Sequence, residues 1–88
     1  MKSSDKRLTL LQGIIIPVEW DDNGNITAIA LSTYDEEEYI ISNDEKFEEL
    51  VKILRQEVKL TGDIIIDHKK KSIFVHSYML KSNSSKEA

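Results

Sequence analysis

The hydrophobic period of the sequence changes from that of a strand to that of a helix and back again, and this helical segment is the feature that most constrains the fold. Within DEKFEELVKILRQ, residues 44–56, the apolar residues Phe47, Leu50, Val51 and Leu54 follow the i, i+3, i+4, i+7 spacing of one helix face. The segments on either side are rich in β-branched residues and favour strands. Because a chain of 88 residues can enclose only one hydrophobic core, the helix and the strands must share it.

Strand-like segments surround the predicted helix. Gly13 indicates a bend or bulge, because glycine relieves crowding in a curved sheet. Pro17 indicates an edge or a place where the strand changes partner, because proline cannot donate to a ladder. The residues of DDNGN tolerate a positive φ and predict a hairpin turn, and a further turn is expected around Tyr34 to Glu37. We expect strands over residues 8–20, 26–34, 38–41, 58–66 and 73–80.

Both ends of the predicted helix carry signals. Ser42 and Glu45 have the spacing of a capping box, which satisfies free backbone N–H groups at a helix start. Acidic residues crowd the first turns, and Lys52 and Arg55 lie in the last, the order that the helix dipole favours. Much of the acidic middle of the sequence is therefore explained by the helix.

Three strands, one helix and two strands is the chain order of the OB-fold, a five-stranded Greek-key barrel. The chain resembles this fold through the bent first strand with Gly13, the DDNGN hairpin, the helix, and VKLTGDIII followed by KSIFVHSY. It resembles the small, uncharacterised bacterial OB-like proteins over about residues 8–80, with flexible tails expected at residues 1–7 and 81–88. The alternative is an α+β antiparallel sheet with the helix packed across one face.

The composition limits which cellular compartments and which kinds of partner are to be expected. The chain has no cysteine, which excludes disulfides and thiolate zinc sites and is compatible with a reducing compartment. The start MKSSDKR holds no signal-peptide segment, and no stretch approaches the roughly 20 apolar residues of a membrane span. We therefore expect a cytoplasmic protein without membrane contact. Its net charge of -4 disfavours strong generic binding of nucleic acid or anionic lipid.

The charge is distributed unevenly along the chain. Residues 19–49 hold eleven acidic side chains against one lysine, whereas residues 50–88 hold eight basic side chains against four acidic ones. An acidic run predicts a face for a basic protein partner. This candidate acidic face comprises Asp35, Glu36, Glu37 and Glu38. Asp21 and Asp22 superficially resemble a calcium loop, but its 12-residue spacing and terminal glutamate are missing, so turn chemistry explains them.

A second candidate surface combines aromatic and basic residues. If Ile73 and Val75 point into the core, alternation directs residues 74, 76 and 78 outward, beside the loop DHKKKS. The OB-fold resemblance implies that such stacking residues and loops hold single-stranded nucleic acid, although the aspartates of DDNGN would repel phosphate. The alternative is that the aromatic residues complete the core after a bulge and the lysines only solubilise the hairpin tip. This candidate face comprises Lys69, Lys70, Lys71, Phe74, His76 and Tyr78.

No motif indicates catalysis. The two histidines, His68 and His76, are not accompanied by a phosphate loop, a nucleophile elbow or metal-ligand spacing. Trp20 is expected to plug one end of the barrel. We expect no enzyme activity, no cofactor and no metal. The leading hypothesis is a non-catalytic domain that binds a protein partner or itself, and the alternative is weak binding of single-stranded nucleic acid.

Overall fold

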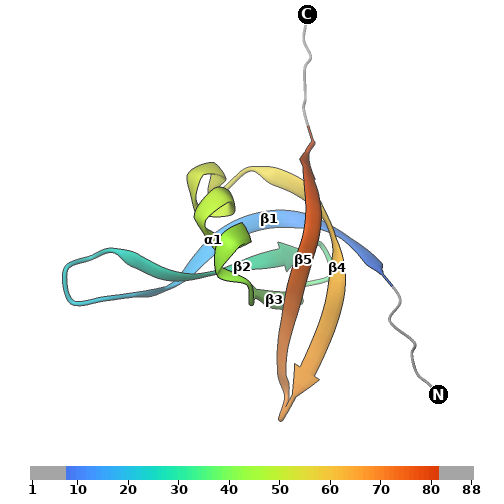
Figure 1. Ribbon diagram of the computed structural model, residues 1–88, viewed down its shortest axis with the longest axis horizontal. Helices are drawn as coiled ribbons and strands as arrows, with labels where there is room; N and C mark the ends of the chain where they lie inside the picture. The colour runs from blue at the N-terminus through green and yellow to red at the C-terminus, as the bar shows by residue number, and fades with distance from the viewer. Residues whose placement is uncertain (1–7, 82–88) are drawn as a thin grey trace, which may run out of the picture.

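The computed structural model describes residues 8–81, which form a mainly β structure with one short helix (Figure 1). The elements are β1 (Thr9–Trp20), β2 (Ile26–Thr33), β3 (Glu38–Ile41), α1 (Asp44–Leu50), the 3₁₀ turn η1 (Val51–Ile53), β4 (Glu57–Asp67) and β5 (Lys70–Leu80). This order confirms the predicted one. The predicted tails, residues 1–7 and 81–88, lie outside the described residues except for Lys81, whose N–H donates to Glu57 O at 2.9 Å.

The five strands pair into one sheet that closes in a ring with the order β1-β2-β3-β5-β4. All neighbouring strands are antiparallel except β3 and β5, which are parallel. The ring closes because β1 changes partner along its length: residues 9–14 pair with β4, and residues 13–20 pair with β2. The sheet is therefore not the open sheet of the alternative prediction.

Gly13 lies where β1 changes partner, the position at which the sequence predicts a bend or bulge. A Cβ there would lie 2.1 Å from Ser32 O, so the strands approach too closely for any side chain. Gly62 in β4 is constrained in the same way by Phe74 O, also at 2.1 Å, beside a bulge in the β4–β5 pairing. Pro17 lies past the part of β1 that pairs with β4, which confirms its predicted place on an edge.

The core lies inside the ring. Val58 and Leu60 of β4 are fully buried, as the two-residue alternation predicts. Because α1 and η1 connect the end of β3 to the start of β4, they lie at that end of the ring, where Leu50 is fully buried. The other helix-face residues, which also pack against the core, are Phe47, Val51 and Leu54. Each fully buried Leu or Ile contributes roughly 1.5–3 kcal/mol by removing apolar surface from water.

The helix begins without the predicted capping box. Its N-cap residue is Asn43, and no side chain forms a cap hydrogen bond there. The Ser42 hydroxyl instead donates to Ile73 O at 3.1 Å, and the Asn43 side chain binds the backbone of Val75. The prediction is wrong because the edge of β5 takes these side chains as hydrogen-bond partners.

The α-helix is also shorter than the predicted segment. It ends at Leu50, and Arg55 adopts a positive φ of 67° after η1. The N–H of Arg55 donates to Ile15 O at 2.7 Å, so the chain already pairs with β1 at the position predicted for the last helical turn. None of the helices within residues 8–81 has the length and apolar character needed to cross a membrane.

Two hairpins, β1 with β2 and β4 with β5, extend from the ring as arms (Figure 1). At the tip of the first, Asp21 Oδ1 accepts hydrogen bonds from the N–H groups of Asn23 and Asn25, each at 2.9 Å, and Gly24 has a φ of 86°. These bonds, above all the one from Asn25, lower the pKa of Asp21 and confirm the predicted turn. Trp20 is 57% exposed, so its prediction as a plug is wrong: it lies on the arm, outside the core.

The tip of the second arm is a tight turn. His68 and Lys69 have φ values of 50° and 71°, and two successive positive values are typical of turns that match the strand twist. Lys70 and Lys71 are therefore the first residues of β5 and pair with β4. The prediction of a longer loop, DHKKKS, is wrong because the two-residue turn brings the lysines into the ladder.

Candidate functional site

A bulge places Tyr78 on the core side of β5, whereas the sequence predicts it on the outside. Opposite the step from Thr61 to Gly62 in β4, β5 contains one extra residue, His76. Past this bulge, Tyr78 lies directly opposite Leu60, which is fully buried, and residues that lie opposite each other share a face of the sheet. The prediction for Tyr78 is wrong because the bulge reverses the alternation.

Helix α1 covers Tyr78. The ring packs against the core, and Lys46 Nζ lies 5.8 Å from its centroid. Burial raises the pKa of Tyr78, and the neighbouring Glu49 raises it further. Tyr78 is therefore half-buried against the core, as the alternative interpretation has it, whereas Phe74, which that interpretation also places in the core, is exposed.

Phe74 and His76 are both exposed, which agrees with their predicted outward orientation. Their ring centroids are 5.5 Å apart with the rings tilted, and Phe74 is 45% exposed. His76 Nε2 lies 2.9 Å from Asp63 Oδ2, and the other carboxylate oxygen of Asp63 is buried without a hydrogen-bond partner among residues 8–81. The ring pair can stack on a ligand, but this carboxylate beside it opposes a phosphate.

The three lysines predicted as one basic cluster differ in their surroundings. Lys69 and Lys70 are exposed at the tip of the arm. Lys71 is ion-paired with Glu37, and its Nζ lies 5.8 Å from the ring centroid of Tyr39. The hydrogen bond to Glu37 raises the pKa of Lys71. The charge of Lys71 is therefore compensated within the chain.

Three of the four predicted acidic residues remain exposed. Asp35 and Glu36 lie in the β2–β3 turn, where Glu36 has a φ of 68°, and Glu38 is opposite Ser32 on β3. Asp35 accepts a hydrogen bond from the Thr33 hydroxyl. Within the described chain, no basic side chain forms an ion pair with Asp35, Glu36 or Glu38. The turn therefore presents three exposed carboxylates that form no ion pair within residues 8–81, although the charge of Asp35 also acts on Lys71 and helps to raise its pKa.

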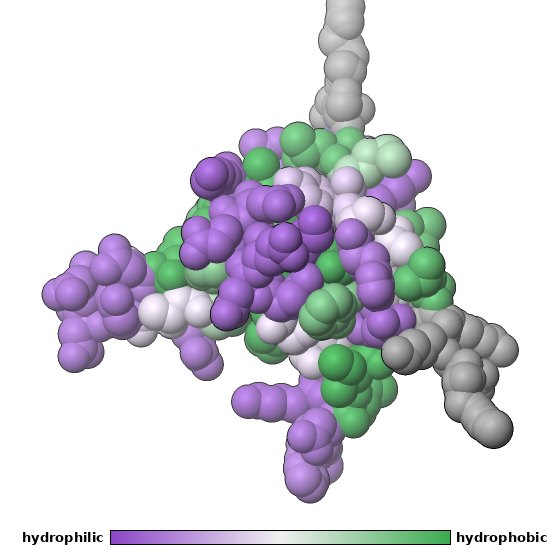
Figure 2. Space-filling view, in the orientation of Figure 1, coloured by the Kyte–Doolittle hydropathy of each residue, from purple (hydrophilic) through white to green (hydrophobic). Residues whose placement is uncertain are grey.

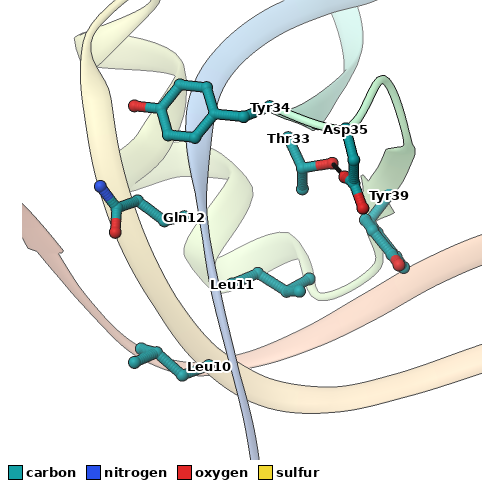
Figure 3. A pocket seen from close by; sticks show the side chains of 7 residues that line it. All are labelled: Leu10, Leu11, Gln12, Thr33, Tyr34, Asp35 and Tyr39. Carbon is teal, nitrogen blue, oxygen red and sulfur yellow. Dashed lines mark hydrogen bonds between the residues drawn. The ribbon is translucent and has the colours of Figure 1, made fainter.

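A groove of about 290 Å³ lies beside this turn (Figure 3). It separates the start of β1 from the β2–β3 turn and from β3. Its lining residues are Leu10, Leu11, Gln12, Thr33, Tyr34, Asp35 and Tyr39. Figure 3 shows Leu10 and Gln12 pointing to one side of β1 and Leu11 to the other, toward Asp35 and Tyr39. The groove therefore combines apolar walls with one carboxylate.

Hydrogen bonds hold one end of the groove. The Tyr34 hydroxyl donates to the Glu57 carboxylate, and Gln12 Nε2 donates to the same carboxylate at 3.3 Å. Lys81 Nζ lies 3.5 Å from it. The charge of Glu57 is therefore compensated, whereas Asp35 on the turn forms no ion pair within residues 8–81.

One edge of β1 faces the groove without a neighbouring strand. β2 ends at Thr33, which lies opposite Gly13, whereas β1 extends to Thr9. From Thr33 the chain turns away into β3. The edge of β1 over residues 9–12 is therefore open on the groove side, while its other edge pairs with β4.

The direction of the backbone groups on this edge follows from the ladder. Ile15 N–H donates to Gln56 O at 3.4 Å and Ile15 O accepts from Arg55 N–H, so Ile15 bonds toward β4. Successive strand residues direct their backbone groups to opposite edges, so Leu10 and Gln12 direct theirs toward the groove. Within residues 8–81, no backbone hydrogen bond joins Leu10 or Gln12 to the β2–β3 turn.

A row of four apolar residues and one serine also crosses the outside of the ring. The register places Ile16, Ala30, Ile40, Ser72 and Ile65 opposite one another in turn across five strands. Ala30 is fully buried between its larger neighbours, and Ile65 is 46% exposed. Figure 2 shows hydrophilic residues gathered over α1 and at the tips of both arms.

Neither this row nor the groove was predicted from the sequence, since each is assembled from separate strands. The tyrosines on either side of the acidic turn are the signal that could have indicated the groove.

The groove offers apolar side chains, two tyrosines and a carboxylate to a ligand. Among the residues described, no group of three or more His, Cys, Asp or Glu side chains could hold a metal ion. No family model, curated protein or solved structure matches the chain in comparisons with known proteins.

Proposed function

We propose that the protein is a non-catalytic interaction domain that binds a basic segment of a protein partner at the acidic groove. Here the acidic groove means the groove between β1 and the β2–β3 turn together with Asp35 and Glu36. The proposed architecture is an OB-like Greek-key barrel, which the ring order, the parallel β3–β5 pair and the helix between β3 and β4 support. We expect it to act in the cytoplasm.

The observation that carries this proposal is the combination, in one groove, of apolar walls with acidic side chains that form no ion pair within residues 8–81. Leu10 is 63% exposed and Tyr34 is 61% exposed, so binding a partner there would remove large apolar surfaces from water. Asp35 and Glu36 would attract a basic partner and orient it. The neighbouring lysine on β4, Lys59, is opposite Gln12 and therefore lies on the far side of β1 from the groove and its carboxylates.

Charge reversal with a matched control tests the proposal. We expect the Asp35→Lys/Glu36→Lys variant to lose most retention of partners from a cytoplasmic extract, and a parallel binding assay with the purified partner to show the same loss. The control, Asp22→Lys/Glu48→Lys, makes the same change of net charge at exposed positions on the first arm and on α1. Equal retention by both variants and the parent would refute the acidic groove as the binding site.

Weak binding of single-stranded nucleic acid remains the second candidate, and the exposed Phe74–His76 pair favours it. This pair adjoins the arm that carries Lys69 and Lys70. A titration with oligo-dT and oligo-rU at low salt should then shift amides in residues 68–76, with log affinity falling by about 0.7 per phosphate contact against log salt. Replacing Lys69 and Lys70 with alanine should flatten that dependence, and unchanged binding would exclude this arm.

A further inference from the structure

We infer that the open edge of β1 receives an extended segment of the partner as an added strand, hydrogen-bonded to the backbone of Leu10 and Gln12. This inference rests on the proposed function and specifies how the acidic groove binds. The occupant it assigns is a peptide in which basic and apolar residues alternate. In strand addition, main-chain hydrogen bonds give affinity and side-chain contacts on alternate residues give specificity.

The edge has the two properties that strand addition requires. Leu10 and Gln12 direct donors and acceptors toward the groove, and no backbone bond to the turn occupies them within residues 8–81. The opposite edge of the same segment is held by β4, so the template is already extended before a peptide arrives. A preordered strand reduces the ordering cost of binding.

The two sides of β1 differ, and this difference selects the pattern of the peptide. On one side an added strand meets Leu10 and Tyr34, which are apolar and exposed. On the other side it meets Leu11 and Tyr39, which are half-buried and pack against the core, with the exposed Asp35 beside them (Figure 3). Side chains of a strand alternate between its faces, so apolar residues suit the first side. On the second side a lysine can lay its aliphatic stem on Leu11 and Tyr39 and bring its ammonium group to Asp35.

Charge decides against a second copy as the occupant. Two copies that met through this edge would bring the Asp35 and Glu36 turns of both chains together, and like charges placed together cost free energy in an interface. A basic peptide instead neutralises these carboxylates.

The first experiment titrates the isotopically labelled full chain with four blocked hexapeptides at low salt. The probes are Val-Lys-Val-Lys-Val-Lys, its block isomer Val-Val-Val-Lys-Lys-Lys, and two N-methylated forms of the alternating peptide, one methylated on the valine nitrogens and one on the lysine nitrogens. Only one set of alternate N–H groups can face β1. We therefore expect the alternating peptide to bind more tightly than the block isomer, and one methylated form alone to lose binding.

Hydrogen exchange and a proline substitution test the edge directly. On binding, the amides of Leu10 and Gln12 should gain protection. Leu10→Pro removes the N–H on the open edge, because the β4 ladder uses the backbone groups of Thr9 and Leu11. It should weaken binding roughly fivefold or more relative to Leu10→Ala, which keeps the N–H. The methylated peptides provide the same test on the unaltered protein.

The outcomes separate this inference from the proposed function. Strand addition is wrong, and the acidic groove is still the binding site, if three results occur together. Both peptide orders bind equally, both methylated forms bind, and only Asp35→Lys/Glu36→Lys weakens binding. If no peptide binds at millimolar concentration and partner retention is also insensitive to charge reversal, both fail. Protection of the Leu10 and Gln12 amides before peptide is added would overturn the inference. If that protection increased with protein concentration, the occupant would be a second copy; if it did not, the occupant would be the chain's own residues.

Discussion

Asn43 and Val75 are joined by a pair of hydrogen bonds that continues the sheet where β3 stops. The side-chain N–H of Asn43 donates to Val75 O at 2.9 Å, and its side-chain oxygen accepts from Val75 N–H at 3.0 Å. β3 pairs with β5 only at Ser72 and Ile73, so the amide occupies the next position along the edge of β5. One side chain therefore links the start of α1 to the strand that carries Phe74 and Tyr78.

This pair predicts an unusual substitution pattern at a helix start. Asn, Asp and Ser are about equally good N-cap residues, so a cap alone would tolerate Asn43→Asp and Asn43→Ser. A carboxylate cannot donate to Val75 O, and a serine hydroxyl has a single, closer oxygen, so only the amide places a separate donor and acceptor on Val75 O and Val75 N–H at once. We expect each variant, and Asn43→Ala, to lower the free energy of unfolding by about 1–3 kcal/mol. Urea unfolding measures this, and parental stability for the serine variant would show that the amide bonds contribute little.

The parts of the fold with local signals were predictable from sequence. β3 occupies Glu38–Ile41 as expected, because the turn before it and the change of period after it bracket the strand. The turn DDNGN likewise forms from its own side chains, with Asp21 binding the backbone of Asn23 and Asn25. Such features depend on neighbours in sequence and on elementary backbone preferences.

The rest of the candidate site depends on partners that are distant in sequence. Tyr78 faces the core because of a bulge, and a bulge is a property of two strands rather than one. Lys71 leaves the predicted basic surface because Glu37, 34 positions away, pairs with it. The capping box failed for the same reason, since Ile73 O binds the Ser42 hydroxyl.

Alanine substitutions at the three glycines are expected to destabilise the fold by two different amounts. Gly13→Ala and Gly62→Ala would each place a methyl group 2.1 Å from a backbone carbonyl oxygen, so paired strands would have to separate. We expect a loss of about 3 kcal/mol or more at each position. Gly24→Ala meets no atom within 4 Å but forces a side chain into a φ of 86°, and about 1 kcal/mol is expected. Chemical unfolding should rank Gly24→Ala as the mildest, and equal losses at all three positions would contradict the close approach of the strands.

Tyr78 predicts a loss of stability at alkaline pH. Burial and Glu49 raise its pKa above the ordinary value of 10.0, so the unfolded chain releases the phenol proton first as the pH rises. This contribution to stability is complete below pH 10 and decreases as the pH rises above it. Urea midpoints measured from pH 8 to 11 should fall less steeply for Tyr78→Phe than for the parent. Tyr39→Phe, which removes a hydroxyl that forms no hydrogen bond within residues 8–81, provides the control, and matching slopes for Tyr78→Phe and the parent would contradict the assignment.

The surroundings of Lys71 predict that this lysine of the second arm stabilises the fold, whereas its neighbour Lys70 does not. Lys71 pairs with Glu37 and lies over Tyr39, so Lys71→Ala removes contacts between β5 and the β2–β3 turn. Lys70→Ala removes an exposed side chain with the same charge. We expect only Lys71→Ala to lower the thermal midpoint, and Glu37→Gln to reduce the difference between these two variants. Salt should also reduce it, because the pair is partly exposed and the screening length at 1 M is about 3 Å. If both alanine variants had the same midpoint at low salt, Lys71 would be as available to a ligand as Lys70.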